Sequence, residues 1–223
     1  MYPHWVGSKD RHNPLRLKPP HQRVGDTSFV ETASVNTHKA TIVFGLVIIL
    51  VASVAGFGQN PDGTNGTIFL GRSYAFVLKE PAGWIIDQQA AKPQHLEAVL
   101  YREGSSWKDA VAVMYARVIY KDEIQNTVDK VITNDVTDFL KLNKDSTVSD
   151  SPSLHTRYNK EAISKVFYDA ANKNYEIVTF IDEPKVVVIL VLSSRNKSEY
   201  EKALPAFKSL VASYFVFMPL VGP

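Results

Sequence analysis

Side chains that commonly carry acid–base, nucleophilic or metal chemistry are sparse after residue 38 of this chain. His95 and His155 are the histidines of that part, and both lie in polar segments without helical i, i+4 spacing. Gly104-Ser105-Ser106 lacks the G-x-S-x-G spacing of a nucleophile elbow, and the chain has no glycine-rich phosphate loop and no cysteine. The sequence therefore predicts a non-enzymatic protein with no catalytic residue, no metal site and no cofactor.

Aromatic and basic residues close together at the end of one predicted strand and in the loop after it are better candidates for contact with a partner. Trp107 follows Gly-Ser-Ser, and Tyr101 and Arg102 come shortly before it. Tyrosine and tryptophan offer large, rigid contact surfaces, so we take Trp107, Tyr101 and Arg102 as the candidate binding residues. The alternative is that Trp107 folds back over the sheet edge and covers the core.

Two other residues stand out against their surroundings. Trp84 follows a turn at Pro81-Ala82-Gly83, and we expect it in the core. Arg117 interrupts the apolar run 111–120. It is predicted either to pair with an acid or to lie at the exposed end of a strand, with an anionic ligand as a further alternative.

Alternating or continuous apolar residues predict most of the domain as strands. They fall at 73–80, 84–86, 96–101, 111–120, 162–170, 175–181 and 185–193, with turn formers at 172–174 and 182–184. The last three are spaced as an antiparallel meander. The runs 111–120 and 185–193 are apolar on both pleat faces, which indicates central strands covered on two sides. The segment 87–95 is predicted to be a polar connection, and 144–157 a loop with one weak strand.

Two segments have the apolar periodicity of helices. Between 124 and 142 the apolar positions recur every three or four residues, in one stripe made of Ile124, Val128, Val131, Ile132, Val136, Phe139 and Leu140. A closing helix spans about 200–214, where Pro205 predicts a short turn to Leu204 and a main helix that begins at the proline. The predicted class is therefore α+β, with an antiparallel sheet of about six strands flanked by helices.

Short motifs at both ends of this domain resemble the PsbP-like and Mog-like families. Tyr74-x-Phe76 followed by Pro81-x-Gly83-Trp84 is similar to their opening strand and turn. The segment Leu204-Pro205-Ala206-Phe207 is similar to the closing helix of bacterial members, so the resemblance covers about 68–217. It implies an α/β/α sandwich and a largely non-enzymatic family, which includes an extrinsic photosystem subunit and a nuclear Ran-binding protein. No binding residue of these relatives is matched.

One stretch has the composition of a bilayer-spanning segment. Residues 40–57 are apolar, Lys39 precedes them, and the next charge is Asp62, which leaves 22 uncharged residues. A helix of that length crosses about 30 Å of hydrocarbon. We expect a transmembrane anchor at 39–58. The apolar core of a cleaved signal peptide is the alternative, because Ser53-Val54-Ala55 has the small-x-small pattern of a cleavage site.

This segment divides the chain into a basic arm at 1–38, a linker at 59–67, the globular domain at 68–217 and a tail at 218–223. Up to Lys39 there are six basic and three acidic side chains, and the arm is predicted to be disordered. The positive-inside rule keeps the arm in the cytoplasm and sends the domain across the cytoplasmic membrane, where it stays tethered or is released after cleavage near Ala55.

The remaining chain has 19 basic and 20 acidic side chains, so it lacks the basic field that attracts nucleic acid. The favoured hypothesis is a non-catalytic extracytoplasmic binding or assembly module with a protein partner. The alternative is a small-molecule-binding domain or weak hydrolase with a pocket near Trp107.

Overall fold

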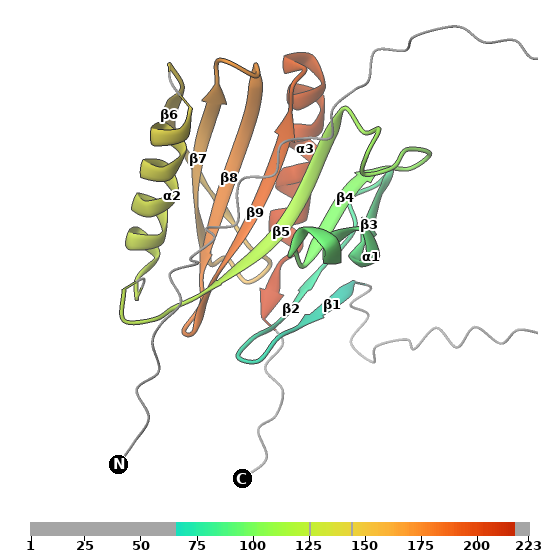
Figure 1. Cartoon of the computed structure of the whole chain (residues 1–223). Coiled ribbons are helices and arrows are strands. Elements are labelled where there is room, and N and C mark those ends of the chain that lie inside the picture. Colours follow the sequence, from blue (N-terminus) through green and yellow to red (C-terminus); the bar gives the residue numbers. More distant parts are fainter. Residues whose placement is uncertain (1–65, 125, 144, 217–223) are drawn as a thin grey trace, which may run out of the picture. The chain divides into compact units, whose positions relative to one another are not determined.

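The structure is a computed structural model that describes residues 66–124, 126–143 and 145–216. Seven strands form its main sheet, in the order β3-β4-β5-β9-β8-β7-β6, and all neighbours are antiparallel (Figure 1). The bounds are β3 Trp84–Asp87, β4 Ala98–Arg102, β5 Ala112–Tyr120, β6 Thr147–His155, β7 Glu161–Asp169, β8 Asn174–Asp182 and β9 Val186–Ser194.

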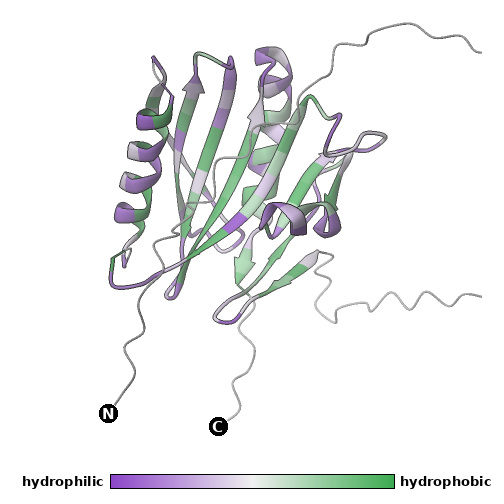
Figure 2. Ribbon diagram, viewed as in Figure 1, coloured by the Kyte–Doolittle hydropathy of each residue, from purple (hydrophilic) through white to green (hydrophobic). Residues whose placement is uncertain are grey.

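The two strands that are apolar on both faces lie inside this sheet. β5 and β9 are third and fourth in the order and pair along their whole length, so the predicted central positions are confirmed. β7, β8 and β9 form the predicted meander. The continuous hydrophobic colouring of β9 in Figure 2 reflects burial from both sides.

The segment 144–157, predicted as a loop with one weak strand, supplies a full edge strand, so the main sheet has seven strands where about six were expected. Its residues 147–155 form β6, which pairs with β7 at the sheet edge. The strand is mostly polar, because an edge strand has solvent on one side, and its register shifts between Ser151 and Leu154, around Pro152. A proline cannot donate to a ladder, so an irregular edge position is where it is tolerated.

A second sheet was not foreseen. β1 (Thr67–Leu70), β2 (Ala75–Leu78) and β10 (Phe215–Val216) form a three-stranded antiparallel sheet in the order β1-β2-β10. The strand predicted at 73–80 belongs to this sheet rather than to the main one. Thr67, which the sequence placed in the linker, is the first residue of β1.

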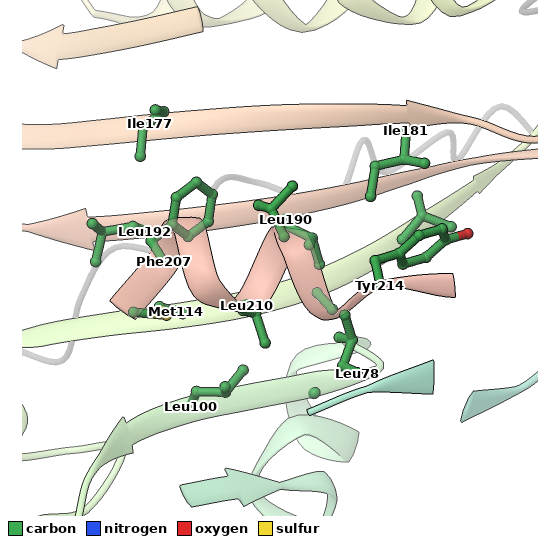
Figure 3. Packing of buried hydrophobic residues seen from close by; sticks show 14 of the residues in the cluster. Leu78, Leu100, Met114, Ile177, Ile181, Leu190, Leu192, Phe207, Leu210 and Tyr214 are labelled. Atoms are coloured by element: carbon green, nitrogen blue, oxygen red, sulfur yellow. The ribbon is translucent and has the colours of Figure 1, made fainter. Parts of the chain in front are cut away.

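Each face of the main sheet has its own hydrophobic core. The long C-terminal helix α3 (Lys197–Ser213) packs on one face, where Phe207 and Leu210 meet side chains of β4, β5 and β9 (Figure 3). The helix α2 (Val128–Leu142) covers part of the opposite face through Val131, Ile132 and Phe139. The described domain is therefore an antiparallel α+β fold with helices on both faces of the sheet.

α2 begins four residues later than the apolar stripe suggested. Thr127 caps it by accepting a hydrogen bond from the Lys130 N–H at 3.3 Å, as expected of an N-cap threonine. Ile124 precedes the cap in a turn held by the Asp122 carboxylate, which accepts from the Ile124 N–H at 2.8 Å. Ile124 and Leu140 are exposed, so these two members of the stripe do not join the core.

α3 is continuous through Pro205, contrary to the predicted break. Pro205 lies on the exposed face of the helix. A proline inside a helix leaves the carbonyl group four residues earlier without its N–H partner. Ala203 and Phe207 on either side are fully buried, so packing against the sheet holds both halves of the helix in one line. Burial therefore outweighs the local preference of proline.

The polar connection 87–95 contains a short helix α1 (Gln88–Ala91) and a 3-10 turn η1 (Lys92–Gln94). The arm 1–38, the apolar run 40–57, the linker up to residue 65 and the tail from residue 217 lie outside the described residues. Within the described ranges, no helix is both long and apolar enough to cross a membrane.

Candidate functional site

Tyr101 lies in β4 beside Asp87, the last residue of β3. The Tyr101 hydroxyl donates to Asp87 Oδ2 at 2.7 Å, while Asp87 Oδ1 accepts from the Ala90 N–H at 2.8 Å and caps α1. The hydrogen bond from the Ala90 N–H has the largest effect on Asp87, and together with the bond from Tyr101 it holds the pKa of Asp87 below its ordinary value. The hydrogen bond to Asp87 in turn raises the pKa of Tyr101. The phenol therefore fixes the junction between β3 and α1.

Trp107 is half-buried and packs against the core on the α2 face of the sheet. Val99 and Tyr101 of β4 reach the same core. This position matches the alternative in which Trp107 covers the core, and it leaves part of the indole at the surface.

Arg102 lies on the other face of β4. Successive side chains of a strand point to opposite faces, and the Arg102 guanidinium lies 5.3 Å from the centre of the Trp84 ring, which is buried in the core on the α3 face. The three candidate binding residues are therefore close in sequence but divided between two faces. Trp84 is a core residue, as predicted.

Arg117 pairs with an acid, the first of the alternatives that its sequence context left open. Its guanidinium is 2.6 Å from Asp135 Oδ1 of α2, and the two side chains are only 12% and 11% exposed. Burial opposes the charged form, but the Asp135 carboxylate, followed by Tyr115, outweighs it and raises the pKa of Arg117. The pair ties α2 to the centre of the sheet.

A second buried polar group lies on the same face, where β8 and β9 meet. The Asn174 amide donates to Glu176 Oε1 at 3.0 Å and to the Ser193 hydroxyl at 3.1 Å. Glu176 and Ser193 are register partners on neighbouring strands, and all three side chains are buried. The Glu176 carboxylate also contributes to raising the pKa of Arg117.

One buried and one half-buried tyrosine on the α3 side donate hydrogen bonds to carboxylates. The Tyr214 hydroxyl donates to Glu183 Oε1 at 3.1 Å, and Lys160 Nζ lies 2.9 Å from the same oxygen. The Tyr74 hydroxyl donates to Glu97 at 2.6 Å. Burial first, and then the neighbouring carboxylate, raises the pKa of both Tyr74 and Tyr214, so both phenols stay protonated and serve as hydrogen-bond donors.

The histidines of the domain do not enter any of these groups. His95 has a left-handed backbone (φ 56°) at the end of η1, and His155 is exposed at the end of β6. Among the residues that the structure describes, no three His, Asp or Glu side chains are arranged to hold a metal ion.

Sequence reasoning missed Asp135 and Glu176. Asp135 follows Val131 by four residues and Ile132 by three, so it shares the apolar face of α2, and that position was the available signal. Glu176 gave no such signal, because a polar residue in an alternating strand normally faces solvent. Its burial depends on what covers this face of the sheet.

No protein-family model and no curated protein matches this sequence. The chain is similar in structure to a solution structure of cyanobacterial PsbP from Synechocystis, with a TM-score of 0.43 and 12% identity over 68% of this chain and 92% of that one. A mutant of protein Mog1 gives a TM-score of 0.40 and 14% identity, over 68% of this chain and 96% of that one.

A further similar structure, from Bacteroides thetaiotaomicron, has a TM-score of 0.35 and 8% identity, over 64% of this chain and 45% of that one. Both families that the sequence resembles are thus among the structural neighbours.

Proposed function

We propose that this chain is a non-catalytic binding or assembly module held at the outer face of the cytoplasmic membrane. Residues 40–57 supply the anchor in this proposal, and the basic arm before them stays in the cytoplasm because of its positive charge. If the chain is cut near Ala55, the same domain is released on the outer side. In either form it works by contact with a protein partner.

The division of Tyr101, Trp107 and Arg102 between the two faces of the main sheet is the observation that carries this proposal. The alternative, a small-molecule pocket or weak hydrolase site near Trp107, needs Trp107 and Arg102 to line one cavity with convergent polar groups. Trp107 packs on the α2 face, whereas Arg102 stacks on Trp84 on the α3 face. This arrangement favours contact through the surface over a shared pocket.

The partners of the buried ionisable groups give a second line of support. Arg117 binds Asp135, Glu183 binds Lys160 and Tyr214, and Tyr101 binds Asp87. Each contact joins two separate segments of the domain, as structural pairs do. Catalysis by acid–base groups would instead need a group poised toward a substrate.

The test is in-cell crosslinking of the full chain followed by affinity capture from solubilised membranes, alongside a thermal-shift screen of metabolites. A control chain carries the arm and the apolar run fused to an unrelated soluble domain. We expect one defined crosslinked partner with the native chain and none with the control, and no metabolite that raises the melting temperature. A shift by a metabolite together with no specific crosslink would replace the proposal with the pocket alternative.

Arg102 is the most exposed of the three candidate contact residues, so it is the one to vary in this assay. Arg102→Glu reverses its charge, and Lys92→Glu, also on an exposed side chain, is the matched control. If Arg102 contacts the partner, the crosslink is lost with the first variant and retained with the second. Equal crosslinking by both would remove Arg102 from the interface.

A further inference from the structure

The three-stranded sheet is apolar on both of its faces. Phe69, Phe76 and Leu78 point into the core on the α3 side of the molecule. On the other face, Ile68, Val77 and Phe215 form one row across β1, β2 and β10, since Val77 is the register partner of the other two. Leu70 and Ala75 form the next row. The outer face denotes the side chains of Ile68, Leu70, Ala75, Val77 and Phe215.

No polar or charged side chain belongs to the outer face, although an antiparallel sheet normally presents polar residues to water. Ala75, Val77 and Phe215, at the centre of the outer face, are buried. At its margin, Leu70 is 73% exposed and Ile68 is 38% exposed. Tyr158 extends this margin beyond β10. Its ring is 70% exposed and meets Phe215 edge to face at 5.9 Å. These exposed side chains lie at two edges of the outer face, Ile68 and Leu70 in β1 and Tyr158 beyond β10. Large apolar side chains exposed around one face are typical of an interaction surface.

The length of the chain before β1 determines how far β1 can lie from the apolar run 40–57. Nine residues, 58–66, separate the apolar run ending at Phe57 from the first residue of β1. Nine extended residues reach at most about 30 Å, and a flexible linker of that length has a mean end-to-end distance of about 17 Å. A bilayer that holds residues 40–57 is therefore within reach of β1, at a high effective concentration.

The side chains around the outer face suit a lipid surface. Leucine and isoleucine partition into the acyl boundary, and tyrosine concentrates at the level of the headgroups. Arg157 lies 5.0 Å above the Phe215 ring, and Arg72 follows β1 by two residues. Both arginines are exposed, where a guanidinium can meet the phosphates of anionic lipids.

We propose that the exposed margin of the outer face, with Ile68, Leu70 and the neighbouring Tyr158, docks on the surface of the membrane in which residues 40–57 are anchored. Ile68 and Leu70 enter the boundary between headgroups and acyl chains, Tyr158 lies at the headgroups, and Arg72 and Arg157 bind lipid phosphate. This inference rests on the membrane tether of the proposed function.

The absence of cysteine from the chain allows a direct test. The full chain is prepared as Leu70→Cys, Tyr158→Cys or Leu142→Cys, labelled with an environment-sensitive fluorophore and reconstituted into vesicles with anionic lipid. Leu142 is the matched control, because it is 65% exposed at the end of α2, outside the outer face. We expect brominated lipids to reduce the fluorescence of the first two labels and to leave the Leu142 label unchanged. Equal quenching at all three positions would overturn the docking.

Quenching of the same labels by iodide in the aqueous phase distinguishes a face that is open to water from one that is covered by protein. If iodide quenches the labels at Leu70 and Tyr158 and brominated lipid does not, the face is open to water. That result contradicts the proposal. Labels shielded from both quenchers show that protein covers the face, whether the apolar tail after residue 216 or a second copy, and this also contradicts it. Unchanged melting of each variant verifies that the label has not disturbed the fold.

Alkaline extraction of the same membranes tests the tether separately. If carbonate releases the full chain, the anchor and the proposed function fail together with the docking. If the chain resists extraction and the labels at Leu70 and Tyr158 are insensitive to brominated lipid, the tether stands and the docking alone is wrong.

Discussion

Arg117 of β5 places a full positive charge on the α2 face of the sheet, beside the apolar Ile189 of β9. Such a charge is tolerated because α2 presents the Asp135 carboxylate to it at 2.6 Å. The desolvation of both ions offsets much of their attraction, so the pair itself adds little net stability. Its effect is on specificity, since it holds α2 in one position along the strands.

Removing one partner of this pair should lower the free energy of unfolding much more than removing both. Asp135→Ala leaves Arg117 buried without its nearest counter-charge, and we expect the free energy of unfolding to fall by about 3 kcal/mol in a denaturant titration. The double variant Arg117→Leu with Asp135→Leu should lie closer to the native protein than the single variant does. Additive losses in the double variant would argue against coupling between the two charges.

The hydrogen bond between Tyr101 and Asp87 predicts a pH-dependent change in stability. The pKa of Asp87 is lowered in the folded protein, so its contribution is present above its ordinary value of 3.8 and is lost as the pH falls through the lower, folded pKa. Tyr101→Phe removes one of the two donors that stabilise the carboxylate. We expect a loss of about 1 kcal/mol at neutral pH that shrinks below pH 3.8.

Unfolding by urea at a series of pH values measures this difference. Tyr158→Phe is the control, because the Tyr158 ring is exposed and contacts Phe215. A loss for Tyr101→Phe that is the same at neutral and acidic pH would show that packing, rather than the carboxylate, is responsible.

At the level of elements, α2 depends on a few deep contacts with the sheet. Phe139 is buried, and its ring meets Phe167 of β7 edge to face at 5.0 Å. Phe139→Ala should lower the free energy of unfolding by about 3–5 kcal/mol. Leu140→Ala, one position further along on the exposed side, should change it by less than about 0.5 kcal/mol. Similar losses for both would mean that this end of α2 packs differently.

α3 offers a test of whether its proline interrupts the helix. In a continuous helix, proline removes one hydrogen bond and costs up to about 3 kcal/mol relative to alanine. Pro205→Ala should therefore stabilise the domain by about 1–3 kcal/mol, measured by thermal or urea unfolding. The exposed change Lys208→Ala is the control. No gain for Pro205→Ala would instead match a main helix that begins at the proline, where that residue is well tolerated.

For the whole molecule, the charge distribution around the apolar run predicts the topology. Because the arm keeps its positive charge in the cytoplasm, the domain 68–217 should lie outside. Protease added to intact spheroplasts should then degrade the domain and spare a cytoplasmic control protein. Full protection until detergent is added would place the domain inside and refute the assigned orientation.

Local patterns in the sequence were sufficient to predict the strands and helices whose buried side chains are apolar in a regular pattern. β5 and β9 are apolar on both faces and lie inside the sheet, and turn formers mark the meander of β7, β8 and β9. The 3.6-residue stripe of α2 likewise identified the face that carries Phe139. In each case a continuous run of side chains must leave water, and its period reveals the geometry that allows this.

Only the tertiary structure decided how distant segments combine. β2 pairs with β10, more than a hundred residues away in sequence, and so leaves the main sheet. The weak strand predicted within 144–157 extends to the nine-residue β6 because β7 pairs with it. The helix α3 passes through Pro205 because Ala203 and Phe207 are buried on both sides of it. The tertiary structure also places Tyr101 and Arg102 on opposite faces of the sheet, because they occupy adjacent positions in β4. Local propensities amount to less than about 1 kcal/mol for most residues, whereas burial of a single large apolar side chain contributes about 1.5–3 kcal/mol, so packing prevails wherever the two conflict.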